Sequence, residues 1–215
     1  VEQLDVSGCN ELCSINFIST YLQSLNLHGK SKLYEIKGFM TDLIELDISD
    51  CTGLSVVDTW SLSCSTLRKI DISGCTNLRT FAVGGNQLEE LNISGCENLI
   101  KLSIPGGTLT QLDLSDSPNL EELGCAKNNL QELDLHLQTK LKDLYCTNNQ
   151  LTKILLSSKQ LVSINCSANK LQSIEIDDCT KLQELRCNEN QLTGTLDLRK
   201  MGQLTYLDCT QNMLT

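Results

Sequence analysis

The sequence predicts an all-β solenoid of about ten coils near 21 residues each, with short parallel strands on two opposite faces and few or no helices. Three observations predict this fold class. A leucine-rich motif recurs along the whole chain at almost constant spacing, and a second apolar segment recurs between its copies. The intervals between these segments are too short for helices of ordinary length.

The first motif reads Leu120-x-x-Leu123-x-Cys125-x-x-Asn128-x-Leu130 in one of its most regular copies. Its first position falls at residues 12, 33, 54, 78, 99, 120, 141, 161, 182 and 204, so the steps run from 20 to 24 residues. Alternating apolar positions within the motif are typical of a short strand with one buried face. We therefore expect one strand of each coil at this motif.

The second segment reads Leu46-Asp47-Ile48-Ser49, and further copies begin at residues 4, 25, 70, 91, 112, 133, 154, 174 and 196. It shows the same alternation of apolar and polar positions. Ser-Gly or Ser-Asp pairs follow several copies and favour tight turns. Each coil is therefore expected to carry a second strand on its opposite side.

Stacked coils are expected to share one aliphatic core, because a single coil cannot bury its apolar face alone. Each buried Leu or Ile contributes roughly 1.5–3 kcal/mol relative to exposure. An asparagine recurs after the first strand, and its amide can bond turn backbone in its own and the next coil. We interpret this row as a structural ladder made of Asn86, Asn128, Asn149, Asn169, Asn190 and Asn212.

The chain has twelve cysteines, most of which fall in two rows of the repeat. The first row consists of Cys125, Cys146, Cys166, Cys187 and Cys209. The second row consists of Cys9, Cys51, Cys75, Cys96 and Cys179. Apolar residues replace the first row in other coils, so we expect free, buried thiols. Parallel side chains suit disulfides poorly, and the absence of a C-x-x-C pair disfavours a metal site.

The formal net charge of −10 argues against nucleic acid, whose phosphates attract Lys and Arg, and gives no support for anionic lipid. No apolar run is long enough to span a membrane. Because no nucleophile elbow, P-loop or zinc-protease motif occurs, we expect neither catalysis nor a cofactor. Acidic residues such as Asp47, Asp71 and Asp113 form a row, and calcium, neighbouring Asn and Ser side chains, or hydration could relieve their repulsion.

Two groups of outward positions on the first strands are candidate ligand contacts. The first group gathers large apolar and charged side chains near the N-terminus, namely Ile18, Lys37, Phe39, Asp58 and Trp60. Its apolar members could instead fill a gap in the core. A step of 24 residues is expected to form a bulge around residues 59–66, beside this group. The second, sparser group consists of Tyr145, Arg186 and Tyr206.

The pattern L-x-x-L-x-L-x-x-N is the signature of leucine-rich repeats. In the variant found here, which has Cys at positions such as 125 and 146, it resembles the repeats of bacterial surface proteins, especially those of gut Bacteroidetes, and is similar to internalins. The resemblance implies a secreted or cell-surface module that binds a protein or a glycan. A structural spacer and an intracellular protein-interaction module are the alternatives, and reduced thiols would suit the second.

Residues 1–215 are expected to form a single leucine-rich-repeat domain, a fragment of a longer array or of a multidomain protein. Neither end of the repeat array resembles a polar cap, and terminal coils need such caps. We therefore also consider end-to-end self-association through the uncapped termini.

Overall fold

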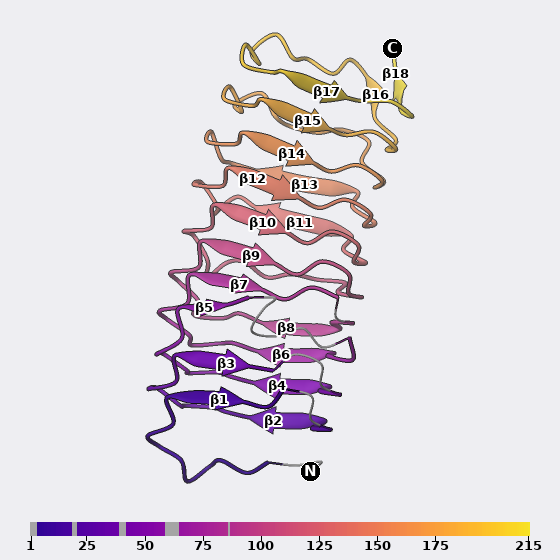
Figure 1. The fold of residues 1–215 in the computed structure, drawn as a ribbon. Helices are drawn as coiled ribbons and strands as arrows, with labels where there is room; N and C mark the ends of the chain where they lie inside the picture. Colours follow the sequence, from indigo (N-terminus) through magenta and orange to yellow (C-terminus); the bar gives the residue numbers. More distant parts are fainter. Residues whose placement is uncertain (1–3, 19–20, 39–41, 59–64, 86) are drawn as a thin grey trace.

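The computed structural model describes residues 4–18, 21–38, 42–58, 65–85 and 87–215. These residues form a β-solenoid of about nine turns at a spacing near 21 residues, and they contain no helix. The turns are stacked in an elongated array with the two termini at opposite ends (Figure 1). The predicted solenoid of short parallel strands is therefore confirmed.

Every copy of the first motif forms a strand, and together these strands make up what we call the first face. β1 (Ser14–Asn16) pairs with β3 (Glu35–Lys37) in parallel. The other strands form an eight-stranded sheet of β5 (Val56–Val57), β7 (Thr80–Ala82), β9 (Lys101–Ser103), β10 (Glu122–Gly124), β12 (Asp143–Tyr145), β14 (Ser163–Asn165), β15 (Glu184–Arg186) and β17 (Tyr206–Asp208). Equivalent repeat positions are direct partners, as Leu123 and Leu144 are.

The opposite face is less regular. In the N-terminal half, its strands run opposite to those of the first face and form a four-stranded sheet (Figure 1) of β2 (Ser24–Asn26), β4 (Glu45–Asp47), β6 (Lys69–Asp71) and β8 (Glu90–Asn92). Further along are the pairs β11 (Glu132–Leu135) with β13 (Lys153–Leu156), and β16 (Thr193–Gly194) with β18 (Met213–Leu214).

Four predicted strands of this face are wrong, since the segments that begin at residues 4, 112, 174 and 196 are not strands. Their inward side chains are still packed inside the stack, because burial does not require a continuous backbone ladder. Leu114 and Ile176, for example, are both buried.

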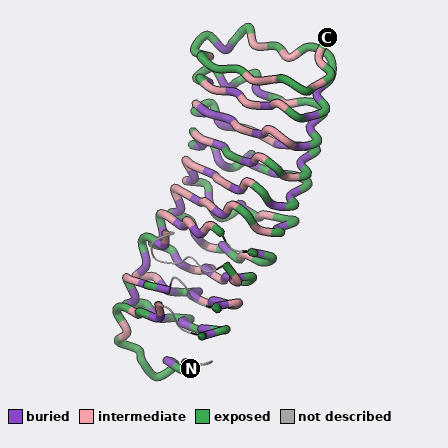
Figure 2. The backbone as a smooth tube through the Cα atoms, turned by 45° about the vertical axis from the view of Figure 1, so that its right-hand side comes forward, coloured by how far each residue is buried: buried purple, intermediate pink, exposed green. Residues whose placement is uncertain are grey.

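The core lies between the two faces, where Leu120, Leu123 and Leu130 of one coil are completely buried. Buried residues alternate with intermediate and exposed ones along the inner turns, whereas the turns at the two ends are mostly exposed or intermediate (Figure 2).

Tight turns follow the strands of the first face. Five residues that are not glycine adopt left-handed backbone there, with φ between 54° and 57°: Lys127, Asn148, Ala168, Glu189 and Gln211. Each of them directly precedes a ladder asparagine. Such backbone is unfavourable for residues with a Cβ, so neighbouring bonds must hold it in place.

Candidate ligand-binding faces

The ladder asparagines join adjacent coils by hydrogen bonds to the backbone. The Asn128 amide Nδ2 donates to the Cys125 carbonyl of its own coil (3.1 Å) and to the Ile104 carbonyl of the preceding coil (3.0 Å). Its Oδ1 accepts from the Leu109 N–H, also in the preceding coil (3.2 Å). The same pattern recurs at Asn149, Asn169, Asn190 and Asn212. Each side chain thus reaches the preceding coil rather than the next, and Asn86 lies outside the described residues.

A second asparagine row precedes the first-face strands and was missed by the sequence analysis. The side chains of Asn77, Asn98 and Asn119 each donate to a carbonyl of the preceding coil at 2.8 Å. Each of these asparagines directly precedes the leucine at the first position of the motif, namely Leu78, Leu99 and Leu120. This recurrence could have identified the row from the sequence. We attribute the same role to this row, that of holding adjacent turns in register.

Ion pairs between adjacent coils add to these contacts on the surface. Arg68 pairs with Glu89 (2.7 Å) and Lys69 with Glu90 (3.0 Å), in each case 21 residues apart. Such exposed pairs are each worth only about 0–1 kcal/mol. Their main consequence is that most carboxylates near a lysine or arginine are already neutralised.

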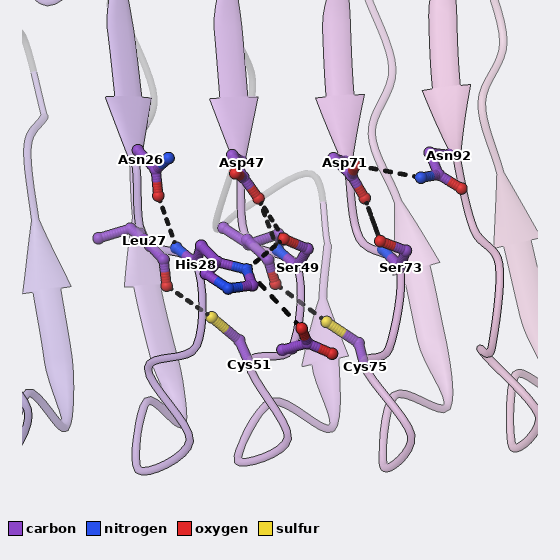
Figure 3. A network of polar contacts seen from close by, with 12 residues as sticks. Asn26, Leu27, His28, Asp47, Ser49, Cys51, Asp71, Ser73, Cys75 and Asn92 are labelled. Atoms are coloured by element: carbon purple, nitrogen blue, oxygen red, sulfur yellow. Dashed lines mark hydrogen bonds and ion pairs between the residues drawn. The ribbon is translucent and has the colours of Figure 1, made fainter.

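The acidic row of the opposite face is occupied by turn hydrogen bonds. Asp47 Oδ1 accepts from the Ser49 N–H (3.0 Å) and from the Ser49 hydroxyl (2.5 Å), and Asp71 and Ser73 repeat the arrangement (Figure 3). Asn92 interrupts the row and donates to Asp71 Oδ2 (3.1 Å). Turn bonds and asparagine therefore relieve the repulsion between these carboxylates.

The same turn bonds lower the pKa of several row carboxyls. Backbone and hydroxyl donors of Ser115 lower the pKa of Asp113. At Asp197 the Arg199 side chain and its backbone N–H lower the pKa to about 2. Within the described ranges, no group of three His, Cys, Asp or Glu residues is arranged to hold a metal ion.

A shallow groove of about 650 Å³ runs along the opposite face over β2, β4, β6 and β8. Its lining includes Glu45 and Glu90 together with the row carboxylates of Asp47 and Asp71. Asp47 and Asp71 each use one carboxylate oxygen in a turn hydrogen bond but keep their negative charge, and Glu90 is paired with Lys69, so the groove remains acidic.

His28 and Ser49, each two residues beyond the end of its strand, β2 or β4, lie in contact, but they do not form a catalytic pair. His28 Nδ1 is 2.9 Å from Ser49 Oγ and 3.7 Å from Asp50 Oδ2. A catalytic histidine uses different ring nitrogens for the nucleophile and the carboxylate. Here both contacts involve the same nitrogen, and the Ser49 hydroxyl donates its hydrogen to Asp47.

The predicted burial of free thiols is confirmed for Cys51, Cys75, Cys96, Cys125, Cys146, Cys166, Cys179 and Cys187. In the second row, the Cys51 thiol donates to the Leu27 carbonyl and the Cys75 thiol to the Ile48 carbonyl, each at 3.1 Å (Figure 3). Burial raises the pKa of Cys51 to about 11 and that of Cys75 to about 12. Burial is a wrong prediction for Cys9, which is exposed, and Cys209 of the first row is only partly buried.

Native alkylation with N-ethylmaleimide is expected to label Cys9 and Cys13 rapidly and the buried cysteines only after denaturation. The two N-terminal thiols are exposed, whereas the buried ones lack both solvent access and a populated thiolate. Mass spectrometry of timed, unreduced digests measures this difference. Bridged peptides, or equal labelling rates at Cys9 and Cys75, would contradict the assignment.

The first candidate ligand group lies partly outside the described residues. Phe39 and Trp60 are not described, nor are residues 59–64 of the expected bulge. Ile18 and Asp58 are half-buried, and Lys37 is exposed and paired with Glu35 of its own strand (2.8 Å).

The second candidate group lies on the outer surface of the eight-stranded sheet. Tyr145 and Tyr206 are exposed at 45% and 46%. The Arg186 guanidinium lies over the Tyr206 ring, 4.7 Å from its centre. Its Nε is 2.5 Å from Glu184 Oε1, an ion pair without hydrogen-bond geometry. The structure therefore brings Arg186 and Tyr206 together, while Tyr145 on β12 lies two strands from Arg186 and three from Tyr206.

Two polar residues of the same surface were missed by the sequence analysis. Asp143 precedes Tyr145 on β12 by two positions, and Ser163 is its direct partner on β14. Ser163 is buried although it belongs to an outward-facing row, and its hydroxyl has no hydrogen-bond partner among the residues that the structure describes. Burial and, secondarily, the charge of Glu122 raise the pKa of Asp143. The repeat pattern does not predict this site, because the site depends on which neighbouring side chains already form ion pairs or hydrogen bonds with other residues.

No protein-family model and no curated protein matches the sequence. Among solved structures, the functional domain of InlJ from Listeria monocytogenes, which includes a cysteine ladder, is 32% identical to this chain and superimposes with a TM-score of 0.68. The match covers 90% of this chain and 40% of the InlJ chain. YopM from Yersinia enterocolitica is 24% identical with a TM-score of 0.75, and the match covers 94% of this chain and 43% of the YopM chain. The plant peptide hormone receptor RGFR1, in complex with RGF2, is 20% identical with a TM-score of 0.64, over 98% and 40%.

This chain therefore spans less than half the length of these three structures. The parallel stack of coils, their spacing near 21 residues and the 32% identity to InlJ all indicate a leucine-rich-repeat fold. The chain is a leucine-rich-repeat solenoid similar to the internalin- and YopM-type repeat proteins of bacteria.

Proposed function

We propose that this chain is a recognition module that binds a protein through the outer surface of its eight-stranded sheet. The observation that carries the proposal is the pair of exposed tyrosines, Tyr145 and Tyr206, together with Arg186. Tyrosine and arginine, like tryptophan, are enriched at the energetic centres of interfaces. The hydrogen-bonded coils beneath them present these side chains on a rigid support.

The comparisons support a binding role in general terms. The receptor RGFR1 is solved in complex with RGF2, so a stack of similar fold carries a recognition surface in that protein. A location at the bacterial cell surface, with a protein or glycan as ligand, is the finer proposal and rests on the likeness to InlJ. The described residues contain no long apolar helix that could cross a bilayer.

A second candidate is an intracellular interaction module, and the buried free thiols favour it. Thiols persist in reducing compartments, whereas secreted proteins more often carry disulfides. Detection of the natural protein in cell-surface and cytosolic fractions distinguishes the two locations.

The tyrosine surface is tested by peptide display and a glycan array on the intact chain. We expect wild-type protein to enrich a consensus among random twelve-residue peptides. Tyr145→Ala or Tyr206→Ala should weaken the affinity for that peptide by about 2 kcal/mol, close to thirtyfold in Kd. Kd is measured by fluorescence polarisation.

The matched control replaces two other tyrosines, Tyr21 and Tyr34, which are more exposed but lie outside this surface. Tyr21→Ala and Tyr34→Ala should leave the affinity unchanged. If neither the peptide display nor the glycan array yields a selective ligand, the chain is better explained as a structural spacer. If the control variants lose as much affinity, recognition is located elsewhere.

A further inference from the structure

One outward row crosses the eight-stranded sheet and contains most of its charges. In register from strand to strand it reads Lys101, Glu122, Asp143, Ser163, Glu184 and Tyr206. Neighbouring strands in a sheet are about 4.8 Å apart, so consecutive members of the row are in side-chain contact range.

The carboxylates on either side of Asp143 and Ser163 are already neutralised. Lys101 pairs with Glu122 (2.5 Å), and Arg186 pairs with Glu184 (2.5 Å). Lys142 attracts Asp143, but its ammonium donates to Glu121 (2.6 Å). Throughout the part of the chain that the structure describes, the half-buried Asp143 carboxylate has neither an ion pair nor a hydrogen bond.

Ser163 is the second unsatisfied group and the direct neighbour of Asp143. The residue is only 7% exposed, and within the described ranges its hydroxyl oxygen has no hydrogen-bond partner. Its own strand points Ile164 inward and Ser163 outward, so this hydroxyl belongs to the ligand side of the sheet. A partly buried charge and a buried hydroxyl without partners both cost free energy.

A cationic hydrogen-bond donor satisfies both groups at once, because a carboxylate and a hydroxyl oxygen both accept. The Tyr145 ring, two positions along β12 from Asp143, offers an apolar surface for the methylene stem of such a donor. A lysine or arginine side chain combines these features. The overall charge of −10 also attracts cationic partners.

We propose that Asp143 and Ser163 form an acceptor site for a lysine or arginine side chain of a bound protein segment, with the Tyr145 ring beside it. This site rests on the proposed recognition role of the sheet and specifies the chemistry of the partner. Asp143 neutralises the cation, Ser163 accepts a second hydrogen bond, and Tyr145 covers the stem.

The test uses nuclear magnetic resonance of the ¹⁵N-labelled chain with Nα-acetyl-lysine methylamide as probe. We expect saturable shifts at the amides of residues 143–145 and 163–165, and none with the uncharged norleucine analogue. Asp143→Asn should weaken binding of the lysine probe by about tenfold or more. Shifts spread over all acidic residues, and unchanged in Asp143→Asn, would overturn the site.

The matched control is Asp208→Asn, which removes a carboxylate from the same sheet. Asp208 accepts from the Thr210 hydroxyl (2.7 Å), so it is already satisfied, and its replacement should leave probe binding unchanged. If spermidine binds more tightly than the lysine probe, the site is one for free polyamines and the proposed partner is wrong.

Ser163→Ala supplies an independent readout. It should weaken probe binding several-fold while leaving Tm unchanged or higher, since it removes a buried hydroxyl without a partner. A fall in Tm would mean that the hydroxyl is bonded in the free protein, and this would overturn the site.

The two proposals can fail separately. Selected peptides that depend on Tyr206 but not on Asp143 would leave the recognition role standing and reject the cation site. A lysine probe that binds at Asp143 in a chain with no macromolecular ligand would reject the recognition role, and with it the protein partner.

Discussion

Replacing Asn169 by alanine is expected to lower the free energy of unfolding by about 3 kcal/mol. Asn169 is 8% exposed, and its amide donates to the Cys146 and Cys166 carbonyls at 3.0 Å each. Its Oδ1 accepts from the Leu151 N–H at 3.0 Å. The substitution leaves these backbone groups without that partner inside the stack and frees the left-handed turn at Ala168.

Urea denaturation followed by circular dichroism measures this loss. The control is Asn188→Ala, two residues before the next ladder position, whose side chain makes only a 3.4 Å contact with Glu189. That variant should change stability by less than about 0.5 kcal/mol. Equal losses in the two variants would show that the ladder is not what joins the coils.

Leu144→Ala is expected to cost about 2–5 kcal/mol, the range measured for removal of a fully buried leucine. Leu144 is completely buried in β12, between the equivalent residues Leu123 and Ile164 of adjacent coils. A cavity in the middle of the stack removes contacts with both neighbours. Because each coil contacts only its neighbours, the loss is expected to fall on the two interfaces of this coil.

The adjacent Tyr145→Ala is the matched control, since this side chain points outward from the same strand. It should change the free energy of unfolding by less than about 1 kcal/mol, while weakening the selected peptide. The two variants thereby separate the core from the binding surface. A large stability loss in Tyr145→Ala would place its ring in the fold rather than in recognition.

Much of the fold could be predicted because the period determines which residues face one another. Leu123, Leu144 and Ile164 share a repeat position, and the structure places them as direct partners in one sheet. The same logic placed the thiols of Cys125 and Cys146 inside the core. The repeat position of a residue follows from the spacing alone, and the spacing can be read directly from the sequence.

The candidate site could be predicted only in part. The outward positions of Tyr145, Arg186 and Tyr206 followed from strand alternation, but alternation does not say which of them meet. The contact between Arg186 and Tyr206 depends on side-chain conformation at the last strand. Asp143 could not be predicted, because its lack of a partner depends on the ion pairs that Glu122 forms with Lys101 and Glu184 forms with Arg186.

The sequence by itself determined the number of strands on the first face, their parallel order and the residues that point inward, because a regular spacing and strand alternation need no further information. Tertiary structure decided which segments of the opposite face pair as strands, that the described ladder asparagines reach the preceding coil, and that Asp143 and Ser163 have no polar partner among the described residues. These outcomes depend on competition among neighbouring donors, acceptors and charges in adjacent coils. Such competition is resolved only when the side chains occupy definite positions in space.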